Sequence, residues 1–260
     1  MAAFLGILSA LNALANPIIS SVTERGAPMA ALDLFGISAV IGFAIVSLER
    51  ISATDGAPES LRSFDKPMFA AVCVAVLIPV GLASGLALFG LGLWLLLSSD
   101  AGSRSRRIGI VLLALSGPFV WGQVAMTLFG EQLLSWDARL VGAFTGSPVD
   151  GNIVRFSGRP TAFYIAAGCS SLHHMTLATV LWASVTQLLG IPITRRSLLF
   201  CLAAAVGVVF VNSLRLAAIA TYPDRFDTLH AGWLGAAFGW AALFVAGGIV
   251  ILGTARAART

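Results

Sequence analysis

Charged residues are scarce in this chain. Asp, Glu, Lys and Arg make up only 11% of its 260 residues, whereas 58% are hydrophobic. A soluble domain carries about a quarter charged residues, and the surface of a soluble protein of this length cannot hide so large an apolar fraction. The composition therefore excludes an ordinary soluble domain and predicts a chain that lies in a lipid bilayer. The net charge is +4, but the basic residues lie mainly in short loops between apolar segments. We therefore interpret them as determinants of membrane orientation and expect no nucleic-acid partner.

Cysteine is also scarce, and the chain has only Cys73, Cys169 and Cys201. Their spacing contains no CxxC metal motif and predicts no disulfide framework. Cys73 and Cys201 lie within apolar segments, where a thiol behaves as a small buried hydrophobe. Cys169 differs from them, because it stands where a long outer segment ends and a new apolar segment begins.

Eight apolar segments approach the length of about 20 residues that a membrane crossing needs. No Lys or Arg precedes the first, so we interpret it as a spanning helix and not as a signal peptide. Pro79, Gly81 and Gly85 break the long segment 67–99, which is either two short helices or a bent pair. The sequence thus predicts an all-α polytopic membrane protein with about eight transmembrane helices, namely 3–21, 29–48, 67–82, 84–99, 108–129, 169–189, 198–220 and 230–253.

The distribution of Lys and Arg predicts the orientation, because cytoplasmic loops are enriched in these residues. With the N-terminus in the cytoplasm, ten basic residues fall in inner segments: Arg50, Arg62, Lys66, Arg104, Arg106, Arg107, Arg195, Arg196, Arg256 and Arg259. Five fall in outer segments: Arg25, Arg139, Arg155, Arg159 and Arg225. We therefore expect both termini in the cytoplasm and residues 131–168 outside.

This outer segment divides the chain into three parts. Residues 1–130 form the N-terminal helices, 131–168 the outer segment, and 169–260 the C-terminal helices. Within the outer segment, the helical spacing of apolar residues over 131–144 predicts an amphipathic helix on the membrane surface. A turn-forming stretch follows, and then β-branched and aromatic residues predict a small hairpin or an extended cap.

Polar residues that could take part in catalysis lie near the outer ends of the last three predicted helices. Cys169 begins one of them, where the positive end of the helix dipole favours a thiolate, and Ser170 or Ser171 is suited to capping that helix. Arg215 lies inside the next helix with Asn212 three residues before it, on the same face. A charged residue at such a position faces a cavity or a partner, unless it extends to the headgroups.

His230 opens the last predicted helix, on the same side of the membrane as Cys169. An imidazole can take the proton of a thiol and return it to a leaving amine, and an arginine can stabilise an oxyanion. Cys169, Arg215 and His230 therefore form a candidate acyl-transfer site. His173, four residues after Cys169, is an alternative base. Cys169, His173 and His230 are also a possible zinc site, although Arg215 would repel the cation and no fourth ligand is apparent.

These residues resemble the exosortase/archaeosortase family of membrane cysteine transpeptidase-like enzymes. The matching elements, in order, are Gly151-Asn152, Cys169-Ser170, Asn212-Ser213-Leu214-Arg215 and His230. The resemblance covers residues 140–250. The family usually continues Cys-Ser with Gly, an aliphatic residue and Arg, whereas this chain has Ser171, Leu172 and His173.

The resemblance implies a function. Cys169 would be the nucleophile, His230 the acid/base and Arg215 the partner of the oxyanion or of the substrate carbonyl, with Asn212, His173, Ser170 and Asn152 in support and no cofactor. The substrates would be exported, membrane-anchored proteins with PEP-CTERM-like C-terminal sorting tails. They would be cleaved through a Cys thioester at the outer face of a bacterial inner membrane, often alongside exopolysaccharide production. The alternatives are a non-catalytic transporter or partner in exopolysaccharide export or synthesis, and a zinc-dependent membrane hydrolase.

Overall fold

The computed structural model describes residues 1–257 except 26, 55–61, 63, 79 and 231, and it describes no side chains at 16–17, 20–22, 24–25 and 27–38. The fold is mostly helical, as predicted. Its helices are α1 (Ala2–Arg25), α2 (Ala27–Ser52), α3 (Asp65–Leu77), α4 (Gly81–Ser98), α5 (Arg104–Leu115), α6 (Trp121–Thr145), α7 (Ser171–Leu188), α8 (Arg195–Thr221), α9 (Phe226–His230) and α10 (Trp233–Ala257). Two short 3-10 helices, η1 (Ala167–Cys169) and η2 (Pro223–Arg225), and three strands, β1 (Val149–Asp150), β2 (Ile153–Arg155) and β3 (Ala162–Tyr164), complete it.

Three helices of the described part of the chain are long and apolar enough to cross a membrane: α4, α8 and α10. By length and composition, the described helices therefore do not supply the eight or so membrane spans that the sequence predicted. The predicted segment 67–99 is two helices, of which α3 has only 13 residues and so extends about 20 Å. Pro79, one of the residues expected to mark this break, lies outside the described residues.

The predicted span 108–129 is wrong, because the chain turns between α5 and α6. Helix α5 ends at Leu115, and α6 starts only at Trp121. Pro118 lies in this turn and has no N–H to continue a helix. The indole of Trp121 packs so closely on Gly117 that a Cβ there would lie 2.6 Å from it, which favours glycine at the turn.

Helix α6 is longer than the predicted amphipathic helix 131–144, which forms its second half. The boundary drawn after residue 130 therefore falls inside a continuous helix. Ala138 and Val141 are buried, whereas Trp136 is 61% exposed, so one face of this half packs against the protein while the opposite face still carries apolar side chains. It ends at Gly146, whose φ of +69° gives the left-handed C-cap that glycine adopts most readily.

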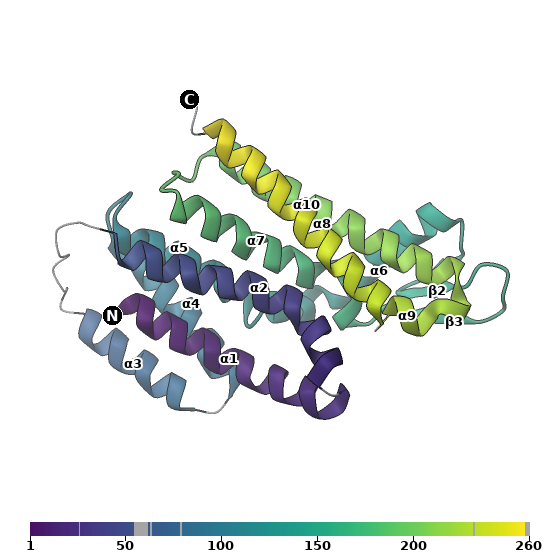
Figure 1. The fold of residues 1–260 in the computed structure, drawn as a ribbon, viewed down its shortest axis with the longest axis horizontal. Helices are drawn as coiled ribbons and strands as arrows, with labels where there is room; N and C mark the ends of the chain where they lie inside the picture. Colours follow the sequence, from purple (N-terminus) through teal and green to yellow (C-terminus); the bar gives the residue numbers. More distant parts are fainter. Residues whose placement is uncertain (26, 55–61, 63, 79, 231, 258–260) are drawn as a thin grey trace.

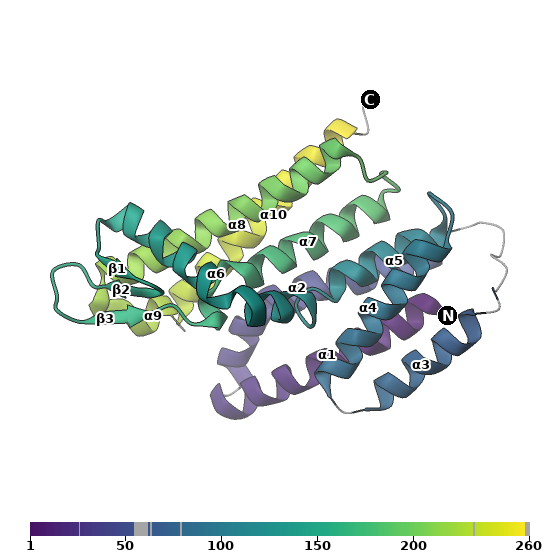
Figure 2. The same ribbon diagram turned by 180° about the vertical axis from the view of Figure 1, so that it is seen from behind.

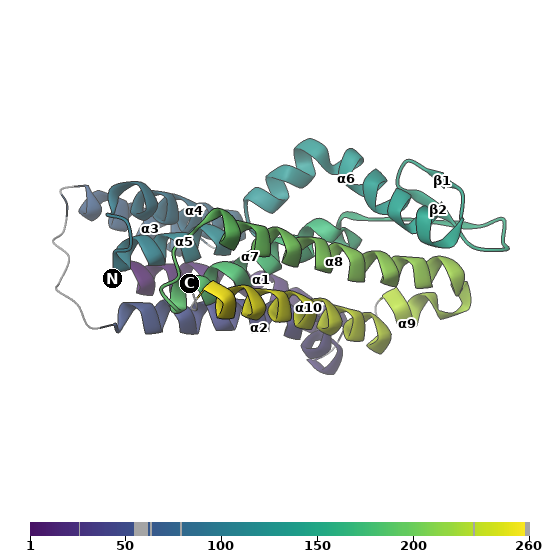
Figure 3. The same ribbon diagram turned by 90° about the horizontal axis from the view of Figure 1, so that it is seen from above.

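The long helices run roughly along one direction, with both chain ends toward one end of the molecule and the sheet and α9 at the other (Figures 1 and 2). Helix α6 leaves the bundle and lies beside it (Figure 3). At the end that holds the termini, the Arg107 guanidinium at the start of α5 donates to the carbonyl oxygens of Gln187 and Leu188 at the end of α7. Loops that the sequence assigns to the cytoplasm thus share one end of the fold. Arg259, which entered the orientation count, lies outside the described residues.

The predicted hairpin is present and has one more strand than expected. The sheet order is β1-β2-β3, with both pairs antiparallel. Gly151 and Asn152 form the two-residue turn between β1 and β2, and the φ of +55° at Gly151 suits a glycine. A second hydrophobic core lies beneath this sheet and contains Ala138, Val141, Val154, Ile165, Cys169, Leu216, Ala217, Ile219, Ala220 and Leu229.

Candidate active site

Cys169 lies just before α7 and not at its first residue. It ends the 3-10 helix η1, and its N–H donates to the Ala166 carbonyl at 2.9 Å. Ser170 is the N-cap of α7, as one reading of the sequence predicted, and its hydroxyl accepts the Leu172 N–H at 3.2 Å. The thiol is 8% exposed. The cap thus holds the cysteine at the positive end of the helix dipole.

Two polar side chains from other helices hold the backbone around Cys169. The Asn212 carboxamide of α8 is 3% exposed and donates from Nδ2 to the Cys169 carbonyl at 2.9 Å and to the Ser171 hydroxyl at 3.1 Å. The Asp137 carboxylate of α6 accepts the Ser171 N–H at 3.0 Å. The start of α7 is therefore fixed from two sides.

His230 lies next to the thiol. Its Nδ1 is 3.6 Å from Cys169 Sγ, and its ring stacks on that of Phe226 with centroids 5.2 Å apart and an interplanar angle of 22°. A hydrogen bond to sulfur is longer than one between nitrogen and oxygen, so this distance is a contact across which a proton can pass. The stacking on Phe226 fixes the plane of the ring.

The expectation that His230 opens the last helix is wrong. His230 ends the short helix α9, and α10 begins at Trp233. The chain folds tightly here, since a Cβ on Gly232 would lie 2.7 Å from the Thr228 Cα. The separate helix α9 places His230 beside Cys169, while α10 packs against α8 and α7.

Arg215 completes the cluster. It lies on α8, six residues before the helix ends at Thr221, and its charge interacts electrostatically with Cys169. Its Nε atom is buried and has no hydrogen-bond partner among the described residues. The fold thus brings together Cys169, Arg215 and His230, which are separated by 46 and 15 positions in the sequence.

His173 does not take the place predicted for it. The four-residue spacing from Cys169 would put both on one face only if they shared a helix, and α7 starts at Ser171. The His173 ring instead packs edge-to-face on His174, at a centroid distance of 5.8 Å. In the described part of the chain, no three His, Cys, Asp or Glu side chains gather to hold a metal, so the zinc site of Cys169, His173 and His230 does not form.

Asn152 connects the sheet to the segment that leads to Cys169. Its Nδ2 donates to the Ile165 carbonyl at 3.0 Å, and its own carbonyl accepts the Ile165 N–H at 2.9 Å. Asn152 is therefore a structural residue, and the Gly-Asn pair serves to fix the start of the path from β3 to the thiol.

A cavity of about 510 Å³ opens beside the thiol and the imidazole. Besides Cys169 and His230 it is lined mainly by apolar and aromatic side chains, from β2 to η1 on one side and from α8 and α9 on the other: Phe156, Ala162, Phe163, Tyr164, Ile165, Ala166, Leu216, Ile219 and Phe226. A cavity that places a thiol and an imidazole on an apolar wall suits a peptide substrate with an apolar side chain.

Two residues of the site were missed by sequence reasoning. Asp137 is a buried carboxylate, at 5% exposure. The sequence indicates its burial only through its spacing on α6, three residues after Leu134 and four before Val141, which places it on the apolar face. Phe226 had no sign in the sequence, because its contact with His230 depends on the existence of α9. His174, the neighbour of His173 on α7, interacts electrostatically with Arg215.

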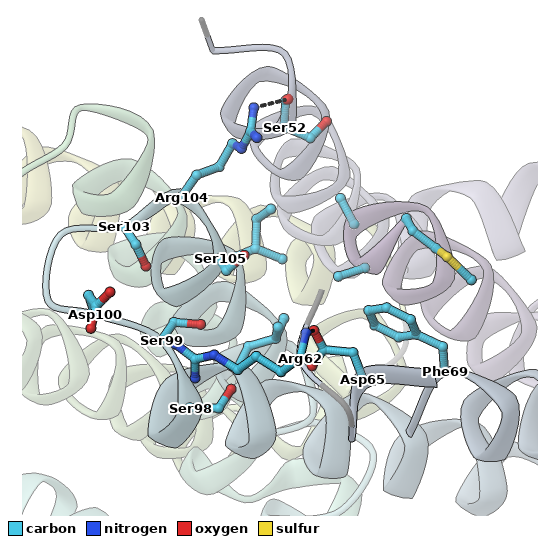
Figure 4. A pocket seen from close by; sticks show the side chains of 15 residues that line it. Ser52, Arg62, Asp65, Phe69, Ser98, Ser99, Asp100, Ser103, Arg104 and Ser105 are labelled. Carbon is cyan, nitrogen blue, oxygen red and sulfur yellow. Dashed lines mark hydrogen bonds between the residues drawn. The ribbon is translucent and has the colours of Figure 1, made fainter. Parts of the chain in front are cut away.

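A second cavity, of about 490 Å³, lies at the end that holds the N-terminus and is lined largely by serines and charged residues (Figure 4). Its polar groups already bind the chain around them. The Arg104 guanidinium donates to the carbonyls of Ser52 and Thr54, and the Asp65 carboxylate accepts the Trp94 indole N–H. Its lining holds no cysteine or histidine, so the candidate active site is the cavity beside Cys169.

No protein-family model, no curated protein and no solved structure matches this chain at a significant level.

Proposed function

We propose that this protein is a membrane-embedded cysteine peptidase or transpeptidase that acts on exported proteins with a C-terminal sorting tail. The observation that carries the proposal is the 3.6 Å contact between Cys169 Sγ and His230 Nδ1 at the wall of an apolar cavity. A nucleophile within reach of a base is the arrangement that covalent acyl transfer requires.

In the proposed reaction, His230 acts first as base and then as acid. Nδ1 takes the thiol proton while the sulfur attacks the carbonyl carbon of the scissile peptide bond. The C–N bond then breaks, and the imidazolium gives its proton to the leaving amine. The product is a thioester on Cys169, which water or an amine resolves. For Nδ1 to accept a proton, the resting imidazole carries its proton on Nε2.

Arg215 supports the same reaction by its charge. The guanidinium interacts electrostatically with Cys169, and its buried Nε–H has no hydrogen-bond partner among the described residues. A fixed cationic donor in a site shielded from water stabilises the oxyanion of a tetrahedral intermediate more strongly than it would in water. The proposal therefore gives Arg215 the developing oxyanion or the substrate carbonyl.

The proposed location follows from the charge distribution and the fold together. The predicted outer segments and the site share one end of the fold, while the basic loops share the other. We propose that the site lies at the outer face of a bacterial inner membrane, both termini being cytoplasmic. A substrate anchored by one hydrophobic helix would then present its cleavage segment at the depth of Cys169.

The test is processing of a tailed reporter by membranes that contain the full chain. Cys169→Ala is expected to abolish cleavage. Cys201→Ala removes a different thiol, on α8, and is expected to retain cleavage. Insertion of each variant is checked by its amount in the membrane fraction. Full processing by Cys169→Ala would rule out the proposed cysteine enzyme, because cleavage would then not need the Cys169 thiol.

A further inference from the structure

The strand that leads to the nucleophile has a free edge. β3 is the last strand of the sheet. The pairs 152–165 and 156–161 are hydrogen-bonded, since Ile165 N–H donates to the Asn152 carbonyl and Phe156 N–H to the Thr161 carbonyl. In an antiparallel ladder such pairs alternate with pairs that make no bond. The peptide groups of Ala162 and Tyr164 therefore point away from β2.

This edge borders the cavity. Five successive residues, 162–166, line it, although successive strand residues point to opposite faces of a sheet. A cavity that touches all of them lies along the edge of the strand and not on one face. Ala162 and Tyr164 are exposed, and among the hydrogen bonds of the described residues none occupies their outward peptide groups. Such an edge can pair with an added strand.

The wall opposite the edge is apolar. Leu216 and Ile219 come from α8, and Phe226 from α9. The ring of Phe226 faces that of Phe163 of β3 with centroids 6.4 Å apart. The lining contains no Asp, Glu, Lys or Arg side chain, so a charged substrate side chain would lose its hydration here without a partner.

We infer that the substrate binds as an extended strand along the free edge of β3 and places an apolar side chain in the cavity between β3, α8 and α9, which brings its scissile carbonyl to Cys169. This binding mode rests on the proposed function and adds to it the substrate class: an extended peptide that is apolar next to the cleaved bond. The edge from 162 to 166 spans about 13 Å, which is four steps at 3.3 Å per residue, enough for a segment of about four substrate residues.

The test uses peptidyl chloromethyl ketones on the purified full chain with Cys73→Ala and Cys201→Ala, so that Cys169 is the one thiol present. The sulfur displaces chloride from the probe, the C–S bond forms as the C–Cl bond breaks, and the thiol proton passes to His230. Three probes are compared: acetyl-Leu-Leu chloromethyl ketone, the same probe with its backbone amides N-methylated, and acetyl-Glu-Glu chloromethyl ketone. Each rate, measured by intact mass, is divided by the rate with iodoacetamide, which is too small to use the edge or the cavity.

The Leu probe is expected to react at least about tenfold faster than either of the others, because the N-methyl probe cannot donate to the β3 edge and the Glu probe must bury a charge. Equal normalised rates for the three probes would overturn the binding mode. A different experiment tests the proposed function: continued processing of a tailed reporter by Cys169→Ala would contradict it. The alkylation rates do not depend on that result.

Discussion

At the scale of single residues, the backbone of the nucleophile depends on a few buried polar groups. Asn212 is the most central of these, since one carboxamide binds the Cys169 carbonyl and the Ser171 hydroxyl. A buried carbonyl that loses its donor costs more free energy than the bond itself contributed, because water cannot replace the donor. Asn212 therefore acts through Cys169, as a positioning residue.

Asn212→Ala is expected to lower the free energy of unfolding by about 1–3 kcal/mol and the processing rate by up to about 100-fold, because the thiol shifts relative to His230. Thermal unfolding and reporter processing measure the two effects. Ser213→Ala is the matched control, since Ser213 is buried next to Asn212 and its hydroxyl has no partner among the described residues. Equal effects of the two substitutions would contradict the role given to Asn212.

Asp137 is predicted to stabilise the start of α7 by its charge as well as by its hydrogen bond. A carboxylate at a helix N-terminus contributes about 0.3–1 kcal/mol, and up to about 2 when partly buried. Asp137→Asn retains an acceptor for the Ser171 N–H and loses only the charge. Asp137→Ala loses both and is expected to lower the unfolding temperature further, as thermal unfolding would show. A larger decrease in unfolding temperature for Asp137→Asn than for Asp137→Ala would refute this order.

Three residues of the candidate site could be predicted from the sequence, and the reason is physical. Polar groups are costly within apolar segments, so Cys169, Arg215 and His230 stood out, and the fold brings them together. The roles given to them remain predictions. Asp137 could not be recognised, because one carboxylate in a helix with a solvent-facing side is ordinary until its burial is known. The position of His173 could not be predicted either, because it depends on where α7 begins.

At the scale of helices, α4 and α5 approach each other through two glycines. A Cβ on Gly92 would lie 2.7 Å from the Leu113 backbone nitrogen, and one on Gly109 would lie 2.9 Å from the Gly92 carbonyl oxygen. Backbone atoms cannot move aside as a side chain can, so these two positions need glycine. Small residues serve this purpose at helix contacts in membranes.

Gly92→Ala is expected to destabilise the protein by about 1–3 kcal/mol, because it forces α4 away from α5. Gly90→Ala, two residues earlier on the same helix, is the control: its Cβ meets nothing within 4 Å, and alanine favours a helix over glycine. Thermal unfolding in one detergent compares the two. Greater destabilisation by Gly90→Ala than by Gly92→Ala would contradict the close contact of α4 with α5 at Gly92.

Element boundaries were less predictable than element types. The hairpin and the second half of α6 follow from alternation and helical spacing. The turn between α5 and α6 was overlooked, because hydrophobicity continues through Gly117 and Pro118 and a search for 20-residue apolar segments passes over a break of five residues. Likewise, five residues of α9 are too few to produce a periodic signal.

At the scale of the whole molecule, the sheet and α9, which border the site, lie at the opposite end of the fold from the start of α1 and the end of α10 (Figures 1 and 3). Three helices are suited by length and composition to cross a membrane. In the proposed orientation, the Cys169 cavity lies near the outer membrane surface and the basic loops near the cytoplasmic one.

This orientation predicts which introduced thiols a membrane-impermeant maleimide can reach. In a chain with its three cysteines replaced, Thr161→Cys in the hairpin is expected to react in spheroplasts that retain an intact inner membrane. Ala101→Cys, an exposed position between α4 and α5, is expected to react only after the membrane is permeabilised. Mass-shift electrophoresis reads both, and the reverse pattern would place the site in the cytoplasm.

The most direct test of the account is capture of the acyl-enzyme. Membranes that contain the full chain and a tailed reporter are quenched in acid, and the Cys169 peptide is examined by mass spectrometry with and without hydroxylamine. The account predicts a reporter-derived acyl group on Cys169 that hydroxylamine removes, with Cys73 and Cys201 unmodified. A reporter that is cleaved through the time course while Cys169 carries no such group at any point would contradict the claim that its thiol is the nucleophile.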